Sequence, residues 1–408
     1  MTKDIRDELK LIYDWSTSEL ADLLDFYIKH DYDPDGGFYG EVTRDFVPIK
    51  DADRALVLNA RLLWTFAAAY RVVKDPRYLE MANHAKTYIQ KYFIDSVYGG
   101  AYWSVHADGS PADETKYPYG ISFIIYGGAE LARANGDREA AAMARKMYDN
   151  LEQYALDKAN GGYFEAFARD WKRLDTSFNI KDTSVSSKAL NTHLHLIESY
   201  TNLMRVDEDP SVRVKVGSLI DIMTTKLLDL EHYHYKPYMT DDWRATDTLF
   251  SYGHDIEGAW LLTEALEAYG DETLIERHKE TSVRITTACE AGFNPETGGI
   301  YYEGDENGPH NLEMSHWVQA EAALGFINAY QLTGDARFLT LTQDIIQYIK
   351  DYISDREGGL FREWLFRADV GAHEHPNILR VNKWKEPYHN GRMCMELIER
   401  IDKMLAQA

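Results

Sequence analysis

The stretch YGGAYWSV, residues 98–105, decides the fold because versions of it recur along the chain. Two glycines followed by apolar and aromatic residues occur at 35–42, 98–105, 160–167, 297–304 and 357–364. The first glycines of successive copies are 63, 62, 137 and 60 residues apart. The long gap spans about two units, so a degenerate copy is expected inside it. HYKPYMTDDW at 234–243 fits, with Lys236 and Pro237 in place of the glycines.

Each of the six units contains one helical stretch before the glycines and one after them. Apolar residues recur at i, i+3, i+4 and i+7 in stretches such as 77–93 before a glycine pair and 60–73 after one. Glycine allows positive φ, and the alternating residues that follow it predict a short β-hairpin. An open array needs polar units at its ends, whereas the last helix, MCMELIERIDKML, is as apolar as the middle ones. We therefore predict an all-α fold: an (α/α)6 barrel, or toroid, with six inner and six outer helices and short β-hairpins in the loops. It would form a single domain over residues 1–408.

The bulk composition excludes several classes of partner. The chain has 408 residues and a formal net charge of −23, which opposes binding to nucleic acid or to an anionic membrane surface. Cys289 and Cys394 match no metal or redox spacing, as expected in a reducing compartment. The charged start, MTKDIRDELK, is not a signal peptide, and no run of about 18 apolar residues indicates a membrane span. We predict a cytoplasmic protein, either a monomer or a weak homodimer.

One unusual polar or aromatic residue lies near the start of the second helix of each unit. In a ring these helix starts share one rim, so the six side chains are expected to line one pocket. The six residues are Arg61, Tyr119, His195, His254, Trp317 and His389.

Two of these histidines have acidic neighbours at helical spacing. Asn191, His195 and Glu198 lie at i, i+4 and i+7 and form one polar stripe, although His195 could equally be a hydrogen-bonded core histidine. His193 faces the other side of that helix and is assigned to structure. Glu257 lies three residues after His254 and could orient its imidazole. Metal helices use this spacing too, but they need further carboxylates, and we assign no metal site.

Aromatic residues on the same rim suit a sugar. Tyr119, Trp317 and Trp384 offer flat apolar faces, although large aromatics more often serve as core packing. No phosphate-binding glycine loop, dinucleotide fingerprint or Ser-His-Asp signature is present. Two further pairs, His232 with His234 and His373 with His375, could share a face of an extended segment but are not assigned a function.

Four stretches resemble the N-acylglucosamine 2-epimerase family and, within it, the cellobiose 2-epimerases. They are SKALNTHLHLIESYTNLMR, SYGHDIEGAWLL, HWVQAEAALGFINAYQ and WKEPYHNGRMCMELIERID, and they occur in family order over essentially the full chain. The resemblance implies an α/α barrel that uses no metal or other cofactor. It also implies a small-molecule β-1,4-linked disaccharide as substrate, inverted at C2 of its reducing-end sugar.

The resemblance also implies which residues form the site. The catalytic set is Arg61, His195, His254, Glu257 and His389. The substrate-binding set is Tyr119, Asn191, Glu198, Trp317 and Trp384. Two departures bear on substrate preference: His316 stands where relatives often have a first tryptophan, and the residues around Tyr119 differ from those of many relatives.

The chemistry of such a reaction assigns roles within this set. Removing the C2 proton of an opened sugar gives an enediolate, whose charge Arg61 can stabilise with help from Asn191 and His195. Inversion needs two bases on opposite faces, and His254 and His389 suit these roles. Glu257 would hold His254 in the required tautomer.

Three other activities remain open from the sequence. An aldose–ketose isomerase would share the enediolate and differ only in the carbon that is reprotonated. A glycoside hydrolase would need two carboxylates roughly 5 to 9.5 Å apart, for which Glu198 and Glu257 are available. A sugar-binding protein without turnover would need neither histidine as a base.

Overall fold

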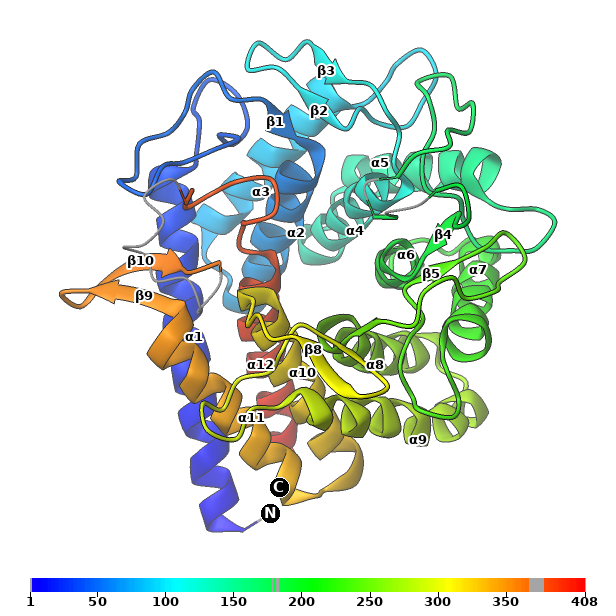
Figure 1. The fold of residues 1–408 in the computed structure, drawn as a ribbon. Helices are drawn as coiled ribbons and strands as arrows, with labels where there is room; N and C mark the ends of the chain where they lie inside the picture. Colours follow the sequence, from blue (N-terminus) through cyan, green and yellow to red (C-terminus); the bar gives the residue numbers. More distant parts are fainter. Residues whose placement is uncertain (1, 178, 181–182, 367–377, 408) are drawn as a thin grey trace.

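Six helices that begin after the repeat turns form the inner wall of a ring (Figure 1). The computed structural model describes residues 2–177, 179–180, 183–366 and 378–407. Each inner helix packs against the next, and the last returns to the first, so the ring is closed. The inner helices are α2 (Leu56–Val73), α4 (Pro118–Asn135), α6 (Leu190–Met204), α8 (Tyr252–Tyr269), α10 (His316–Thr333) and α12 (Tyr388–Ala406).

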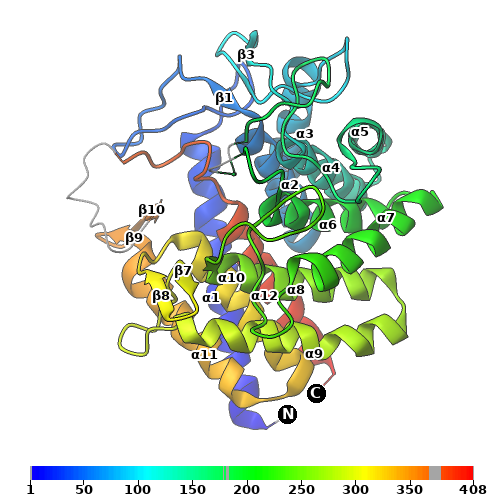
Figure 2. The ribbon, with the colours of Figure 1, turned by 45° about the vertical axis from the view of Figure 1, so that its right-hand side comes forward.

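The other six helices of the described chain pack around this wall (Figure 2). Five of them contact the inner helix that precedes them in the chain, while the first contacts α12 and completes the last pair. The (α/α)6 barrel expected from the repeats is therefore confirmed. The outer helices are α1 (Lys3–His30), α3 (Pro76–Tyr88), α5 (Arg138–Asn150), α7 (Pro210–Asp221), α9 (Glu272–Ala288) and α11 (Ala336–Tyr348).

Short capped turns reverse the chain from each inner helix to the next outer one. Three inner helices end at a glycine in the left-handed conformation, with φ of 79° at Gly136, 70° at Gly270 and 73° at Gly334. Five outer helices then begin after an aspartate whose carboxylate accepts a backbone N–H of the first turn. These aspartates are Asp75, Asp137, Asp209, Asp271 and Asp335.

Three of the glycine turns share one backbone geometry. Gly99, Gly161 and Gly298 have φ of 74°, 77° and 82°, values that few side chains tolerate. Each turn is closed by an antiparallel bridge between the residues that flank it, which are Ile94 with Ala101, Leu156 with Tyr163, and Phe293 with Ile300.

The degenerate copy has this geometry, but in a register different from the one expected. Its bridge joins Leu228 to Tyr235, so Tyr233 and His234 occupy the positions of the two glycines. Tyr233 has a φ of 61°, as the first glycine does in other copies. The prediction that Lys236 and Pro237 replace the two glycines was therefore wrong. It rested on the distance along the sequence between copies, which carries no information on backbone conformation.

Four small antiparallel sheets lie in the loops, several of them immediately before inner helices. Their strand orders are β1-β2-β3, β4-β5, β6-β7-β8 and β10-β9, so short hairpins are confirmed among the described residues. The strands are β1 (Arg54–Ala55), β2 (Ser104–Val105), β3 (Pro111–Asp113), β4 (Lys188–Ala189), β5 (Tyr238–Met239), β6 (Phe250–Ser251), β7 (Glu303–Asp305), β8 (Gly308–Asn311), β9 (Ser354–Glu357) and β10 (Leu360–Trp364).

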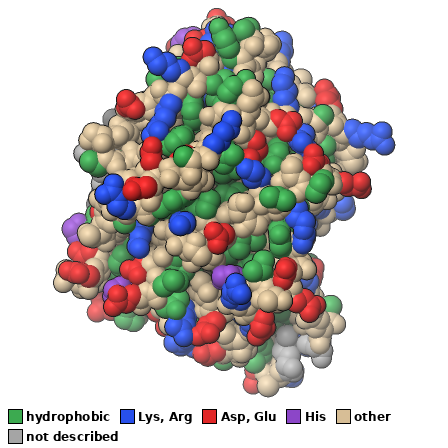
Figure 3. All heavy atoms as spheres, turned by 90° about the vertical axis from the view of Figure 1, so that its right-hand side faces the viewer, with side chains coloured by type: hydrophobic (Ala, Val, Ile, Leu, Met, Phe, Trp, Pro, Cys, Tyr) green, Lys and Arg blue, Asp and Glu red, His purple; other side chains and the backbone are tan. Residues whose placement is uncertain are grey.

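The inner helices are buried almost all round, while the outer surface is polar. Within the described chain, α2 is the one helix long and apolar enough to cross a membrane, but 78% of its 18-residue stretch is buried inside the ring. A helix enclosed in this way is a core helix. On the face in Figure 3, acidic and basic side chains are interspersed among small apolar groups.

Candidate active site

The six rim residues meet at one end of the ring, as the repeat pattern predicts. All six lie within the first two turns of their inner helices, one from each of α2, α4, α6, α8, α10 and α12. They line a cavity of about 360 Å³. The full lining of this reaction cavity is Arg61, Tyr119, Asn179, Asn191, His195, His254, Glu257, Tyr302, Trp317, Phe366, Trp384 and His389.

Trp317 packs against both of the histidines to which the proposed chemistry assigns proton transfer. Its indole centroid is 4.9 Å from that of the His254 imidazole and 5.4 Å from that of His389. The two imidazoles come from α8 and α12 and line the same cavity. A molecule bound in this cavity can therefore contact both.

Arg61 brings a permanent positive charge into the cavity wall. Its Nη1 donates to Glu386 at 2.6 Å and its Nη2 donates to the Tyr119 hydroxyl at 2.8 Å. Burial alone lowers the pKa of Arg61, but Tyr119 and Glu386 raise it above its ordinary value. Burial also raises the pKa of Tyr119 to about 12, which keeps its hydroxyl protonated. The guanidinium is held in one orientation by two partners.

His389 is oriented by a carboxylate that the sequence argument did not assign. Its Nδ1 lies 2.7 Å from Oε1 of Glu321, on α10. An ionised carboxylate only accepts, so while Glu321 is charged Nδ1 of His389 carries the proton and Nε2 keeps its lone pair. Burial holds the pKa of His389 well below its usual range, against the opposing effect of Glu257. The resting imidazole is therefore neutral and able to act as a base.

His195 has the same arrangement with Glu198, three residues later on α6. Its Nδ1 lies 3.0 Å from Oε2 of Glu198, and burial lowers the pKa of His195 to about 3. Its ring packs edge-on against Tyr119, with centroids 5.1 Å apart. His195 therefore lines the cavity as a neutral imidazole.

The position of Glu198 corrects its expected role in substrate binding. Glu198 does not line the cavity but is buried behind it. Both of its carboxylate oxygens lie close to the Tyr388 hydroxyl, at 2.5 and 2.6 Å, and Oε1 also pairs with Arg392. Both carboxylate oxygens of Glu198 are thus bonded to protein groups, including Nδ1 of His195, and do not face the cavity.

The expected partnership of Glu257 with His254 is also corrected. Glu257 lines the cavity, but its Oε1 accepts from Nη2 of Arg392 at 2.5 Å, and no hydrogen bond joins it to His254 among the described residues. Spacing i, i+3 makes a contact possible, but a buried guanidinium competes for the same carboxylate. Burial lowers the pKa of His254, and the negative charge of Glu257 opposes this.

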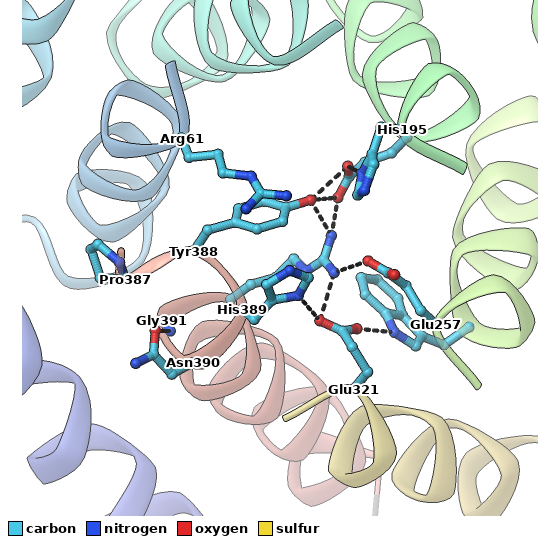
Figure 4. Close-up of polar contacts among 12 residues, drawn as sticks. Arg61, His195, Glu257, Glu321, Pro387, Tyr388, His389, Asn390 and Gly391 are labelled. Carbon is cyan, nitrogen blue, oxygen red and sulfur yellow. Dashed lines mark hydrogen bonds and ion pairs between the residues drawn. The ribbon is translucent and has the colours of Figure 1, made fainter. Parts of the chain in front are cut away.

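Arg392 joins three carboxylates, two of which, Glu257 and Glu321, are labelled in Figure 4. Its side chain is fully buried and forms ion pairs with Glu198, Glu257 and Glu321, which come from three different helices. Arg392, Glu321 and Tyr388 were not predicted from the sequence. The spacing held a signal, because Arg392 follows His389 at i+3 and Glu321 follows Trp317 at i+4.

Glu257, Glu321 and His389 offer ligand atoms that lie within 4.8 Å of one another, a set not found in the sequence. Nη2 of Arg392 donates to both carboxylates, at 2.5 and 2.7 Å. A protein cation already pairs with both carboxylates of this set, so we assign it no metal.

Asn191 reaches the cavity together with a neighbour from the preceding loop. Its Nδ2 donates to Oδ1 of Asn179 at 3.1 Å, and Nδ2 of Asn179 donates to the buried Glu165 at 3.2 Å. Burial raises the pKa of Glu165 to about 7. Asn179, Asn191, His254 and Tyr302 also border an adjoining cavity of about 210 Å³.

Three histidines to which no function was assigned form hydrogen bonds with other protein groups. Nδ1 of His193 donates to the Ala189 carbonyl, and its Nε2 accepts from the Tyr163 N–H, which is 3.1 Å away. His234 binds the buried Asp255 at 2.8 Å, and His232 binds Asp229 at 3.2 Å. His373 and His375 lie outside the described residues.

His316 stands where a tryptophan was expected from relatives. Its Nδ1 lies 3.2 Å from the carbonyl of Phe366, which lines the reaction cavity. Burial lowers the pKa of His316 to about 3. His316 thus forms a hydrogen bond to the segment next to the cavity, and its side chain is not part of the cavity lining.

Comparison with known proteins places this geometry in a family. The model of the N-acylglucosamine 2-epimerase (GlcNAc 2-epimerase) family matches residues 37–380. A cellobiose 2-epimerase of Bacteroides fragilis is 39% identical over 364 residues, which cover 89% of this chain and 92% of the relative. The solved structure of a cellobiose 2-epimerase from Bacillus thermoamylovorans has a TM-score of 0.89 at 34% identity and covers 96% of this chain and 100% of that one.

A D-mannose isomerase of Marinomonas mediterranea is more distant. It is 23% identical over 393 residues, covering 92% of this chain and 94% of the relative. The family match and the similarity to a solved structure over most of the chain agree with the closed ring. The chain belongs to the N-acylglucosamine 2-epimerase family.

Proposed function

We propose that the protein is a cellobiose 2-epimerase, which reversibly inverts C2 of the reducing-end glucose or mannose unit of β-1,4-linked disaccharides. The observation that carries the proposal is that the imidazoles of His254 and His389 both pack against Trp317 in a cavity that Arg61 also lines. Cellobiose, lactose and mannobiose are the expected substrates.

The first chemical problem is the charge that forms when C2 loses its proton. Once the sugar ring is open, the electron pair left on C2 moves onto the carbonyl oxygen and gives an enediolate. Charge that develops in a buried site is stabilised by fixed donors and cations. Arg61 supplies the cation, held by Glu386 and Tyr119, while Asn191 and His195 supply further polar contacts in the same lining.

The second problem is inversion, which needs a base on each face of C2. One imidazole takes the proton through its free nitrogen, and the other, as imidazolium, returns a proton to the opposite face after rotation about C2–C3. Histidine suits this exchange because each ring can change charge once per turnover: one imidazole starts neutral and the other charged, and the two states are exchanged when the product has formed. His389 has its Nδ1–H bound to Glu321, which stabilises the imidazolium when Nε2 gains a proton.

The cavity volumes and the lining side chains are suited to a disaccharide of two linked sugar rings. The reaction cavity of about 360 Å³ shares Asn179, Asn191, His254 and Tyr302 with the adjoining cavity of about 210 Å³. Trp317 and Trp384 supply the aromatic faces on which sugar C–H surfaces pack.

Hydrolysis of the glycosidic bond is not supported by this geometry. A glycosidase needs two carboxyl groups flanking the bond. Among the described residues that line the reaction cavity, Glu257 is the one carboxylate, and Arg392 holds it in an ion pair; Asp247 and Glu303 line the adjoining cavity only.

The test is incubation with a panel of β-1,4-linked disaccharides in deuterated water, followed by NMR. We expect the C2 epimer as product, with deuterium at C2. His254→Asn and His389→Asn should each abolish epimerisation, while the exposed His310→Asn should behave as wild type. A ketose labelled at C1 as the main product would instead show an aldose–ketose isomerase, and release of monosaccharide would show a hydrolase.

We also propose that the protein acts in the cytoplasm as a monomer or weak homodimer. Two free, buried cysteines agree with a reducing compartment. The net charge of −23 favours repulsion between copies. Sedimentation at micromolar concentration should show mainly the monomer, and a stable higher oligomer would contradict this.

A further inference from the structure

We propose that Arg392 is a positioning residue that sets the tautomers of His195 and His389 together, through the carboxylates it binds. The inference rests on the proposed function, because it concerns how the same site prepares its imidazoles. Arg392 does not line the reaction cavity and is fully buried behind it, so it acts through other groups.

The arrangement around Arg392 is a hub with three acidic arms. Its Nη1 pairs with Glu198, and its Nη2 donates to Glu257 at 2.5 Å and to Glu321 at 2.7 Å. Glu198, Glu257 and Glu321 belong to α6, α8 and α10, while Arg392 belongs to α12. One guanidinium therefore ties four of the six inner helices together directly behind the reacting groups.

Two of the three arms each end on an imidazole of the cavity. Glu198 lies 3.0 Å from Nδ1 of His195, and Glu321 lies 2.7 Å from Nδ1 of His389. An ionised carboxylate forces its imidazole to carry the proton on Nδ1, whereas a protonated one can donate to Nδ1 and move the imidazole proton to Nε2. The charge state of the arms thus decides whether Nε2 offers a lone pair.

Burial disfavours the charged form of Glu198 and Glu321 and so raises the pKa of each, whereas the positive charge of Arg392 lowers both pKa values. Burial raises the pKa of Glu321, while Arg392 and the Trp260 N–H, which donates at 2.8 Å, lower it. Burial raises the pKa of Glu198 in the same way, and Arg392 and Tyr388 oppose this. Arg392 is the cation shared by both carboxylates, so weakening its contacts favours protonation of both.

The guanidinium is suited to this task by its shape. It presents several N–H donors in one plane and can bond carboxylates on two sides at once, whereas an ammonium group is a point charge. Other charged or titratable groups face the same region from each neighbouring helix. They are Arg61 of α2, Tyr119 of α4, His195 of α6, His254 of α8 and Tyr388 of α12.

The experiment compares Arg392→Lys with Arg400→Lys, using the full-length enzyme and cellobiose. Both arginines lie on α12 in ion pairs, but Arg400 binds Glu396 and lines a cavity that contains none of the rim residues. Lysine keeps one positive charge in each place, so the carboxylates are not left without a cation. Arg392→Lys should lower kcat by about tenfold or more, as loss of an orienting partner does elsewhere, with little change in KM.

The pH profile separates positioning from general structural support. Glu198 and Glu321 bind protons more tightly in Arg392→Lys, so activity should be lost at a higher pH on the acidic side than in wild type. Arg400→Lys should keep the wild-type acidic limb. The inference is overturned if both variants have the same acidic limb and the same kcat.

A second variant covers the case in which Arg392→Lys does not fold. Glu321→Gln keeps an oxygen for Nδ1 of His389 but cannot carry a charge, so kcat should fall while KM is retained. Wild-type kcat in a folded Glu321→Gln enzyme would overturn the inference. Absence of C2 exchange in the wild type would instead contradict the proposed function, so the two failures are distinguishable.

Discussion

At the scale of single residues, the cavity contains one fixed cation and several imidazoles kept neutral by burial. Arg61 keeps its charge because Tyr119 and Glu386 bind it, and His195 and His389 keep a lone pair on Nε2 because carboxylates bind Nδ1. In a carbohydrate epimerase, this combination separates the group that stabilises charge from the groups that move protons.

Replacement of Arg61 should therefore affect the chemical step more than binding. In Arg61→Met we expect kcat to fall by about 10²–10³, the usual effect of removing one stabilising donor from a developing oxyanion. Steady-state kinetics with cellobiose would measure this. Arg71→Met is the matched control, because Arg71 also lies on α2 in ion pairs but lines a different cavity. Equal kcat values in the two variants would contradict the role of Arg61.

The sequence predicted the cavity lining better than the contacts behind it. Position at a helix start was enough to bring Arg61, His254 and His389 to one rim. The hydrogen-bond partner of Glu257 was not predictable. The i, i+3 spacing shows that Glu257 can touch His254, but it does not show that Arg392 binds the same carboxylate. Arg392 itself was missed, since its three partners lie on helices 71 to 194 residues away.

At the scale of elements, the repeat turn was predictable from glycine, and its degenerate copy was not. Gly99, Gly161 and Gly298 indicate where the left-handed residue of the turn lies, because glycine adopts the left-handed conformation without strain. In the fourth copy Tyr233 adopts a φ of 61° with no such signal in its side chain. Alignment by dipeptide therefore chose Lys236 and Pro237, three residues too late.

Two glycines with similar φ should differ in their tolerance of alanine. At Gly136, φ is 79° and a methyl group would meet no atom within 4 Å, so Gly136→Ala should cost about 1 kcal/mol from backbone strain. At Gly162, φ is 73° and a Cβ would lie 2.5 Å from Trp243 and 2.7 Å from His193. We expect Gly162→Ala to cost about 1–3 kcal/mol more, measured by urea unfolding. Equal costs would show that the turn does not pack as described.

At the scale of the whole molecule, closure of the ring is what gathers the site. The apolar character of the last helix predicted closure, and α12 does pack between α10 and α2. Closure brings His389, near the end of the chain, within 2.7 Å of Glu321 and places Arg392 among three other helices. The repeat alone could predict the ring but not which side chains meet at its centre.

The ring should be sensitive to acid because it buries neutral histidines. Burial lowers the pKa to about 4 for His193, and to about 3 for His195 and His316, from 6.5. The unfolded chain therefore binds protons first, so this stability is fully present above pH 6.5 and is lost as the pH falls toward 4. Each group contributes a slope of up to about 1.4 kcal/mol per pH unit.

Urea unfolding at several pH values would measure this sensitivity. The free energy of unfolding should fall from pH 6.5 to pH 4.5, and His316→Asn should flatten the decline. His310→Asn, at an exposed position, should leave it unchanged. An unchanged slope in His316→Asn would show that His316 does not titrate as its burial requires.

The central claim is that two imidazoles serve opposite faces of C2, and isotope exchange in the single-histidine variants tests it most directly. His254→Asn and His389→Asn would each be incubated in deuterated water with both the glucose-ended and the mannose-ended disaccharide. The account predicts no interconversion by either variant, but C2 exchange without inversion for one epimer in each, with the two variants exchanging opposite epimers. Interconversion by either variant, or exchange of the same epimer by both, would contradict it.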